Sequence, residues 1–456
     1  MRNPAPAGSL IDIADVIDRS RVGALQITMF ILCAACLIMD GFDVQAVGYV
    51  APSLIREWSI TGSTVGNILA AGNAGVLVGS LVFTMLADKI GRRPVLIVAT
   101  VYFAVLTILT GFVTSVDQML LVRFVAGLGL GCIIPNATAL IGEYSPKRKR
   151  VALMATISVG FTAGAAFGGF VAAWLIPDFG WRSVFYFGGA IPLVIAVLMY
   201  VWLPESLQFM ALRAKDPAGL AGWLRRIDPT LSVTPATRFV LREENRGGVP
   251  AMHLFREGRA LGTVLLWVIN FMNIFNLYVL SGWMPTVASQ LGYSTRTAVL
   301  VGTTVQVGGL LGTFWLTWLI GKFGFVHVLV TAFAVAFISI TLIGQPGLAV
   351  WMLFLLVFIA GSCVVGGQPT VNALAGTYYP TYLRSTGIGW GLGIGRAGAI
   401  VGPWLVGQFM GMKWSITDIF YASAIPALIA ALVMLSLHWV MRSTTSRVRP
   451  IDVVAH

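Results

Sequence analysis

Charged residues are scarce in this sequence. Only 11% of the 456 residues are Asp, Glu, Lys or Arg, whereas 57% are hydrophobic, and the mean hydropathy is +0.86. Soluble domains carry roughly 25% charged residues, so a water-soluble globular protein is excluded. The composition instead predicts a chain that lives in a lipid bilayer.

Cysteine and histidine are also few, with four of each. Cys33 and Cys36 form a C-x-x-C pair inside an apolar run, where small residues pack helices together. A redox or metal site requires polar surroundings and further ligands, so we interpret these cysteines, together with Cys132 and Cys363, as helix-packing residues. The sequence shows no metal-ligand cluster, no nucleophile paired with a histidine and no phosphate-binding glycine loop in its polar segments. We therefore expect neither an enzyme nor a cofactor or metal.

Long apolar runs dominate what is present. A helix of about 20 apolar residues crosses the hydrocarbon layer of a membrane, and we place twelve such runs. They lie near residues 24–46, 63–86, 95–115, 118–141, 151–174, 183–203, 261–286, 297–320, 325–345, 348–372, 384–408 and 416–440.

The basic residues indicate how the chain is oriented. The first 23 residues are polar and no small-residue cleavage site follows the first run, so we expect that run to be a retained anchor. Basic clusters follow the second, fourth and twelfth runs, at 89–93, 147–150 and 442–449. By the positive-inside rule, both termini and the long polar segment are cytoplasmic. The net charge of +12 then reflects topology, and we expect no nucleic-acid partner.

The chain contains an internal repeat. The strings PNATALIGEYSPKRKR and PTVNALAGTYYPTYLR match at a constant offset, which pairs Pro135 with Pro369 and Arg150 with Arg384. Almost the same offset aligns TMLADKIG with TWLIGKFG. A duplicated six-span unit is typical of secondary transporters, in which two bundles rock about a site near the membrane midplane.

The one long polar segment separates six apolar runs from six. We therefore predict an all-α integral membrane protein with twelve transmembrane helices in two six-helix bundles. The parts are a cytoplasmic N-terminal tail at 1–23, an N-terminal bundle at 24–203, a cytoplasmic linker at 204–260, a C-terminal bundle at 261–440 and a cytoplasmic C-terminal tail at 441–456.

Several motifs carry a resemblance to a known family. LADKIGRRP after the second run, RFVAGLGLG in the fourth and LPES after the sixth look like motifs of the major facilitator superfamily. MDGFDVQAVGYVAPSL in the first run and YYPTYLRSTGIGWGLGIGRAGAIVGP around the eleventh are similar to the aromatic acid:proton symporters, the family of bacterial 4-hydroxybenzoate permeases. The resemblance covers nearly the whole chain. It implies the major facilitator fold and a bacterial inner membrane.

Two carboxylates, Asp40 and Asp43, stand in the first run three residues apart and so on one helix face. A bare carboxylate is costly in hydrocarbon, so we expect this face to point inward, with Arg123 at a comparable depth. We predict that one aspartate pairs with Arg123 and the other exchanges a proton, and the sequence leaves open which one titrates. The alternative is that both aspartates only brace the helix end. The resemblance favours the transport role, because the aspartates of this motif are implicated in transport by aromatic acid symporters.

The second half has the opposite composition. From Gly258 to Thr417 there is no Asp or Glu, yet Arg396 lies about twelve residues into the eleventh run, near the middle of the bilayer. A guanidinium stays charged and binds a carboxylate bidentately, so we predict that the substrate supplies the missing acid. The alternatives are an ion pair with an aspartate of the first half, or hydrogen bonds to helix carbonyls.

Polar and aromatic residues are expected around that arginine. Apolar walls with a few convergent polar groups suit a small ligand, and aromatic faces suit an aromatic ring. The same residue types also join helices and fill interiors, so each of them has a structural alternative. The candidates are Asn270, Asn273, Asn276, Tyr278, Gln306, Gln368, Asn372, Trp390 and Trp404.

The loop LADKIGRRP predicts a cytoplasmic gate. Asp88, Arg92 and Arg93 can latch helix ends through charge-assisted bonds that break in the other arrangement of the bundles. Glu143 and Arg150 are expected to do the same beside the fourth and fifth runs. The alternative is that these basic residues only anchor the cytoplasmic helix ends by the positive-inside rule, and such anchoring is expected in either case. The second copy lacks the acid and both arginines, so we expect an asymmetric latch.

Together these features predict a secondary transporter that imports a small aromatic carboxylate, similar to 4-hydroxybenzoate, with protons and by alternating access. The expected partners are the acid, protons and membrane lipid, and we expect a monomer. One alternative is the same machine with a sugar, an aliphatic acid or an exported drug as its cargo. Another is a sensor that binds aromatic acids without transporting them, which the short 204–260 segment disfavours because it has no recognisable signalling domain.

Overall fold

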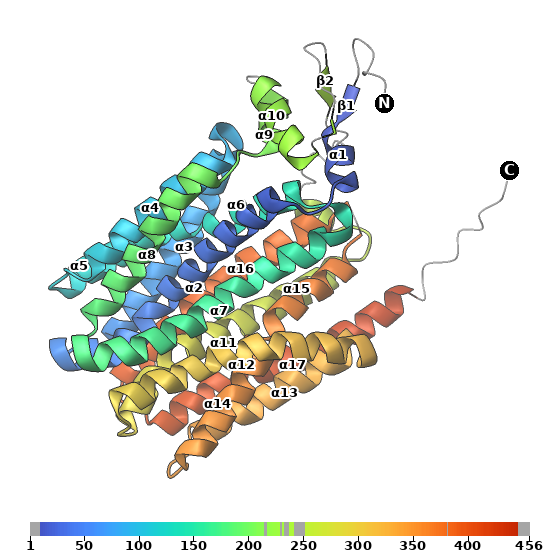
Figure 1. Ribbon diagram of the computed structural model, residues 1–456. Helices are drawn as coiled ribbons and strands as arrows, with labels where there is room; N and C mark the ends of the chain where they lie inside the picture. The colour runs from blue at the N-terminus through green and yellow to red at the C-terminus, as the bar shows by residue number, and fades with distance from the viewer. Residues whose placement is uncertain are drawn as a thin grey trace. The chain divides into compact units, whose positions relative to one another are not determined.

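The computed structural model describes residues 10–213, 217–228, 230–231, 237–240, 251–380 and 382–445. Most of these residues are helical (Figure 1). The first series of long helices is α2 (Ala24–Trp58), α3 (Gly62–Ile90), α4 (Arg92–Thr110), α5 (Val116–Leu130), α6 (Ile133–Tyr144), α7 (Lys147–Phe179) and α8 (Arg182–Trp202). The second is α11 (Ala260–Gln290), α12 (Thr295–Phe323), α13 (Phe325–Ile343), α14 (Val350–Val364), α15 (Gly367–Tyr378), α16 (Arg384–Gly411) and α17 (Ile416–Thr445).

The helix bounds reproduce the sequence repeat. Adding 233 to both bounds of α3 and α4 gives the bounds of α12 and α13, and adding 234 to those of α5 and α6 gives α14 and α15. The repeat also includes a break in one span of each series. The chain leaves the helix at Gly131–Cys132 between α5 and α6, and at Val365–Gly366 between α14 and α15. The two halves are therefore built on one duplicated backbone plan.

Eleven of the helical spans in the described part of the chain are long and apolar enough to cross a membrane, with α5–α6 and α14–α15 each counted as one. Helix α16 is long enough but is not among the eleven. It carries Arg384, Arg396 and many glycines, which lower its hydropathy. It corresponds to the eleventh of the twelve predicted spans. The chain is an all-α, multi-pass membrane protein.

The contacts divide the chain into two compact units. The first contains residues 1–50 and 71–245, and the second contains 51–70 and 246–456. The end of α2 and the start of α3 thus group with the second unit, where Arg56 Nη2 donates to Thr295 Oγ1 at 2.8 Å. The boundaries expected for the two bundles and the tails stay a prediction.

Close helix packing recurs at equivalent places in the two units. A Cβ placed on Gly75 of α3 would stand 2.0 Å from Phe124 O of α5, and one on Gly308 of α12 would stand 2.4 Å from Phe358 O of α14. Only glycine permits such an approach of two backbones. Gly127, Gly129 and Gly131, and Gly391 and Gly395, also lie close to neighbouring helices.

The polar segments form a small structure at one end of the first unit. Strand β1 (Leu10–Asp12) pairs in parallel with β2 (Arg238–Val240), and α1 (Ile13–Arg19) follows β1, with α9 (Leu207–Arg213) and α10 (Pro217–Ile227) nearby (Figure 1).

Asp18 of α1 accepts from the Lys147 backbone N–H at 2.8 Å and pairs with the Lys147 ammonium at 3.1 Å. Burial raises the pKa of Asp18, but these bonds outweigh it, so the net pKa lies below its ordinary value. A short 3₁₀ helix, η1 (Ala251–Phe255), precedes α11.

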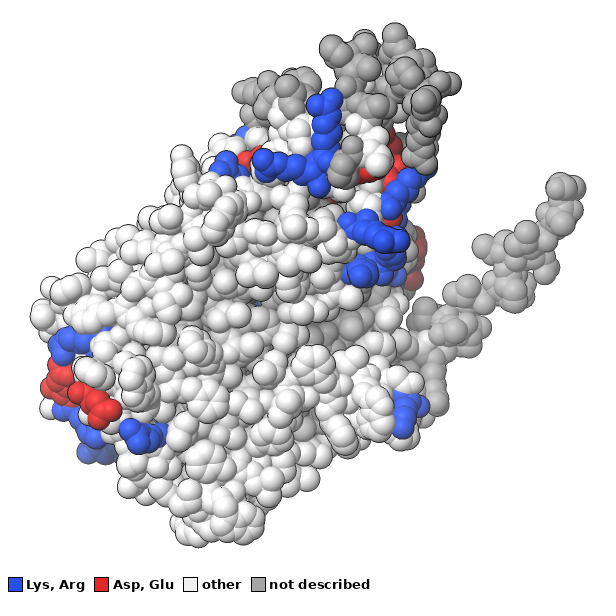
Figure 2. Space-filling model, in the orientation of Figure 1, with Lys and Arg blue, Asp and Glu red and all other residues white. Residues whose placement is uncertain are grey.

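Charged side chains gather at the helix ends. On the face shown in Figure 2, Lys, Arg, Asp and Glu stand beside the ends of the helices, and the middles of the helices are almost uncharged. This distribution is the one that a lipid-facing surface requires, because an unpaired charge in the hydrocarbon layer is costly.

Candidate functional site

An ion pair lies in the interior of the first unit. Asp43 of α2 is fully buried, and Arg123 of α5 donates to both of its carboxylate oxygens, from Nη1 to Oδ1 at 3.2 Å and from Nη2 to Oδ2 at 2.8 Å. Nη2 also donates to the Asp43 carbonyl at 3.3 Å. The prediction that one aspartate pairs with Arg123 is confirmed for Asp43, and the geometry is the bidentate one that guanidinium favours.

Two further residues contact this pair. Thr107 of α4 donates its hydroxyl to Asp43 Oδ1 at 2.6 Å, and the Arg123 guanidinium lies 5.9 Å from the centre of the Phe185 ring. Both were missed at the sequence level. Thr107 was recognisable only as a hydroxyl within an apolar run, and such residues are common in membrane helices.

Asp40 lies one helical turn before Asp43 in a different environment. Its side chain is 2% exposed and lies near the thiols of Cys36 and Cys132. The Cys36 sulfur is in turn 3.3 Å from Thr100 Oγ1. The two aspartates are therefore not equivalent, because Asp43 is bound by a guanidinium and a hydroxyl, whereas Asp40 borders two buried cysteines.

In the second unit, a network of amides joins α11 to α15. Gln368 of α15 donates to Asn270 Oδ1 at 3.0 Å and to Asn372 Oδ1 at 3.3 Å, and accepts from Asn273 Nδ2 at 2.7 Å. Asn273 Nδ2 also donates to Val364 O at 3.1 Å, where α14 ends. Asn273 Oδ1 is buried without a hydrogen-bond partner among the described residues. The network brings together four of the predicted residues, Asn270, Asn273, Gln368 and Asn372, and leaves the Asn273 Oδ1 acceptor without a bond from a described residue.

Arg396 stands on α16 beside this arrangement. Helix α16 approaches α11 through Gly391 and Gly395, at whose positions a Cβ would lie 3.3 Å from Asn270 Nδ2 and 2.3 Å from Ile274 Cδ1. The Arg396 side chain is partly buried, and its guanidinium has no hydrogen-bond or ion-pair partner within the described residues. Since the charge is permanent, an anion that reaches Arg396 would meet an unsatisfied donor.

Trp390 and Trp404, which flank Arg396 in the sequence, differ in their contacts. Trp390 is 47% exposed and stacks on Trp267 of α11, with ring centres 5.9 Å apart and planes at 23°. Phe255 meets Trp267 edge-on at 5.4 Å. Trp404 is 43% exposed. Trp267 was not among the residues predicted from the sequence. In the structure its buried Nε1 has no hydrogen-bond partner among the described residues.

Three other predicted residues lie outside the amide network. Gln306 of α12 donates to Ser281 Oγ of α11 at 2.8 Å. Asn276, with its amide oriented to satisfy both partners, donates to Ser423 O at 2.7 Å and accepts from Ala427 N at 3.0 Å. Gln306 and Asn276 thus join α11 to α12 and α17, which was the structural alternative. Tyr278 is partly buried on α11.

The predicted gating residues form a network within the first unit. Arg92 donates to Glu143 of α6, whose other oxygen accepts from Ser206 Oγ at 2.5 Å. Glu205 Oε1 accepts from the backbone N–H groups of Arg92 and Arg93 at 3.0 and 3.1 Å, at the start of α4. A carboxylate at a helix N-terminus is favourable. Glu205 and Ser206 belong to the LPES motif, which the sequence marked without assigning them a role.

The remaining gating residues have local contacts. Arg93 Nη2 donates to Tyr200 O at 2.5 Å, and Arg150 Nε donates to Ser145 O at 3.3 Å. The side chain of Asp88 lies outside the described residues. A gating role for these residues stays a prediction, because the observed bonds hold α4, α6 and the segment after α8 together within one unit.

The fold and these motifs define a class of membrane transporter. The model of the Major Facilitator Superfamily matches residues 33–255 and 266–454, and the chain belongs to this superfamily. It is a transporter rather than an enzyme, and its twelve-helix architecture is confirmed, with α16 as the twelfth span beside the eleven that are long and apolar enough to cross a membrane.

Within the superfamily, the chain is related to aromatic acid transporters. It is 35% identical to the 4-hydroxybenzoate transporter PcaK of Pseudomonas putida, over 93% of this chain and 95% of that protein. The gallate transporter of the same species is 34% identical over 94% and 96% of the two chains. The benzoate transport protein of Acinetobacter baylyi is 31% identical over 92% and 91%. The resemblance seen in the sequence is confirmed.

Solved structures agree with the fold. The crystal structure of a D-xylose-proton symporter matches with a TM-score of 0.69 at 18% identity, and covers 90% of this chain and 97% of that one. An inward-facing bacterial homologue of the human lysosomal transporter Spinster matches with a TM-score of 0.72 at 16% identity, over 94% and 100%. At such identities the likeness concerns the fold and not the cargo.

Proposed function

We propose that this protein imports a small aromatic carboxylate together with protons, by alternating access, across a bacterial inner membrane. In this topology both termini are cytoplasmic, and the chain acts as a monomer. The observation that carries the proposal is the contrast between two arginines. Arg123 is neutralised by Asp43, whereas Arg396 has no acidic partner within the described residues.

The substrate carboxylate is proposed to bind the Arg396 guanidinium bidentately. The amides of Asn270, Asn273 and Gln368 and the Trp390 ring are the proposed neighbours of the aromatic ring and its substituents. Offset or edge-on contact with an aromatic side chain favours a ring over an aliphatic chain. The names of the relatives, which refer to 4-hydroxybenzoate, gallate and benzoate, support this class of cargo.

We assign the exchanged proton to Asp40. Protonation of Asp43 would remove the charge that holds Arg123 and would leave a buried guanidinium unpaired, which is costly. The side-chain hydrogen bonds of Thr107 and Arg123 go to the Asp43 carboxylate, and Asp40 lies one turn away on the same helix face. It can therefore change its protonation state while the pair of Asp43 and Arg123 stays intact. The gating residues of the Arg92 network are proposed to close the cytoplasmic side in one state.

The test is uptake of radiolabelled aromatic acids into proteoliposomes with an imposed pH gradient. The panel contains 4-hydroxybenzoate, gallate, benzoate, a sugar and an aliphatic acid. We expect accumulation of an aromatic acid that requires the gradient, is lost in Asp40→Asn, and is retained in Arg296→Ala, which removes an exposed arginine at the start of α12. Accumulation of the sugar or the aliphatic acid alone, with no aromatic acid taken up, would refute the proposed cargo.

Asp40→Asn also separates proton coupling from binding. A transporter that has lost its proton carrier is expected to exchange internal for external substrate without a gradient, since exchange needs no net proton movement. If Asp40→Asn still accumulates substrate only when the gradient is imposed, the assignment of the exchanged proton to Asp40 is wrong. An imposed membrane potential would then report stoichiometry, because each net charge contributes ~2.3 kcal/mol per 100 mV.

A further inference from the structure

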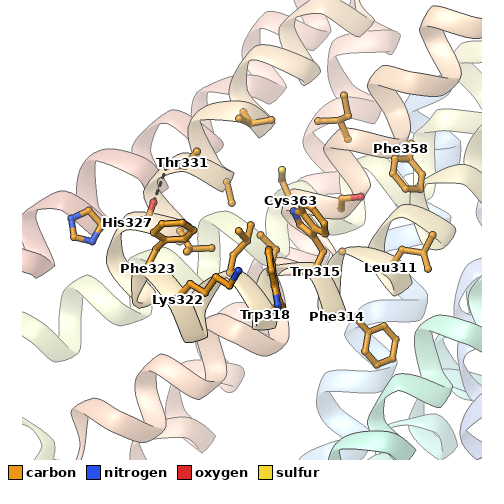
Figure 3. A pocket seen from close by; sticks show the side chains of 18 residues that line it. Leu311, Phe314, Trp315, Trp318, Lys322, Phe323, His327, Thr331, Phe358 and Cys363 are labelled. Atoms are coloured by element: carbon orange, nitrogen blue, oxygen red, sulfur yellow. Dashed lines mark hydrogen bonds between the residues drawn. The ribbon is translucent and has the colours of Figure 1, made fainter.

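An open groove of about 1290 Å³ lies between α12, α13 and α14 in the second unit. Its lining includes none of the residues of the proposed substrate site. Figure 3 shows Leu311, Phe314, Trp315 and Trp318 along α12, with Phe358 and Cys363 on α14. The four side chains on α12 are exposed, so the groove opens to the outside of the helices, and its walls are apolar.

The dimensions of the groove exceed those of the proposed cargo. Pockets for drug-sized ligands measure ~300–1,000 Å³, and a single-ring acid would leave most of this volume empty. Along α12 the lining runs from Leu311 to Phe323, which is about 18 Å at 1.5 Å per residue. This length is about half of the ~30 Å hydrocarbon layer, so the groove matches the acyl chain of one membrane leaflet.

One end of the groove is basic. Lys322, near the end of α12, is exposed and places its ammonium 3.9 Å from the centre of the Trp318 ring. His327, at the start of α13, also lines the groove, and its ring centre lies 5.9 Å from that of His438. No Asp or Glu occurs in the sequence between Gly258 and Thr417, so no acid on α12, α13 or α14 neutralises this end.

We propose that the groove binds one anionic phospholipid of the cytoplasmic leaflet. The phosphate of the headgroup contacts Lys322, and an acyl chain runs along Trp318, Trp315 and Phe314 toward Leu311. The inference rests on the topology proposed above, which puts the Lys322 end of α12 at the cytoplasmic surface, and not on the identity of the cargo. Anionic lipids of that leaflet attract basic residues, and an ammonium binds phosphate as a point charge.

The test is native mass spectrometry of the purified protein titrated with phosphatidylglycerol or with phosphatidylcholine of the same acyl chains. We expect one tightly held phosphatidylglycerol, and weaker binding of phosphatidylcholine. Lys322→Gln should lower the phosphatidylglycerol affinity about fivefold, which is the usual contribution of one basic residue at an anionic surface. Lys322→Arg should retain it, and glycerol 3-phosphate should not compete, because it lacks the acyl chain.

Two further variants separate the groove from general electrostatics. Thr331→Trp places a wide side chain on an exposed wall of the groove and should abolish the tight site with Lys322 intact. Lys413→Gln makes the same change of charge at an exposed lysine outside the groove and should have no effect. Equal binding of the two lipids, or equal losses in Lys322→Gln and Lys413→Gln, would overturn the proposal.

Discussion

The two units share a backbone plan but differ in their buried charge. Helices α3 to α6 and α12 to α15 have bounds related by a nearly constant offset. In the first unit, however, Asp43 and Arg123 form a closed ion pair, whereas in the second Arg396 has no acidic partner within the described residues. Duplication therefore preserved helix packing, which depends on glycine contacts, and the chemistry of the two halves diverged at a few charged positions.

The largest expected effect comes from removing the unpaired charge. Arg396→Ala should reduce uptake of the aromatic acid by about 100-fold, because truncating one partner of a bidentate charge pair costs several kcal/mol. Arg396→Lys should restore part of this loss, since lysine keeps the charge but not the planar fork. Initial uptake rates in proteoliposomes give the comparison. Wild-type rates in Arg396→Ala would place the substrate carboxylate elsewhere.

Removing the paired arginine, Arg123, should lower the stability of the protein. Arg123→Ala leaves Asp43 buried without its guanidinium and should destabilise the protein by about 3–5 kcal/mol, whereas Arg396→Ala should leave stability almost unchanged. Thermal unfolding of both variants in the same detergent measures the difference. Combining Arg123→Ala with Asp43→Asn should recover part of the loss. Similar melting temperatures for the two single variants would contradict the contrast between the units.

The shared backbone plan predicts similar losses at equivalent glycines. Gly75→Ala and Gly308→Ala each force a Cβ against a backbone carbonyl of the neighbouring helix, which should cost about 1–3 kcal/mol of stability. Gly367→Ala is the matched control, because a Cβ there meets nothing within 4 Å. A large loss in only one of the two variants, measured by thermal unfolding, would show that the packing of the two units is not equivalent.

The smallest effect is expected at the polar end of the first unit, which has no described counterpart in the second. The folded pKa of Asp18 is lowered, so its stabilising contribution is present above the ordinary pKa of 3.8 and is lost as the pH falls through the folded value. Asp18→Asn should weaken this contact by at most about 1 kcal/mol at pH 7. Amide exchange of residues 10–20 should be faster in the variant at pH 7, and the difference from wild type should shrink as the pH falls below 3.8. A difference that stays constant as the pH is lowered would contradict the ionic origin of the contact.

The sequence predicted most of the fold because its signals are local or repeated. Apolar length identified the spans, and the matching strings around Pro135 and Pro369 identified the duplication. Breaks such as Gly131–Cys132 were not predicted, because an apolar run looks continuous when its helix is interrupted. The pairing of β1 with β2 also lay beyond the sequence, since the two strands are short and more than 200 positions apart.

For the candidate site, the sequence by itself determined which charges are rare and therefore informative: Asp40, Asp43, Arg123 and Arg396. Their rarity follows from the cost of charge in hydrocarbon and needs no coordinates. Only the tertiary structure decided that Asp43 rather than Asp40 pairs with Arg123. It also separated Gln368, which joins the amide network, from Gln306, which bonds Ser281. Such choices depend on the rotation of each helix about its axis and on distances of a few ångströms between helices, and neither is encoded in the spacing of residues along one run.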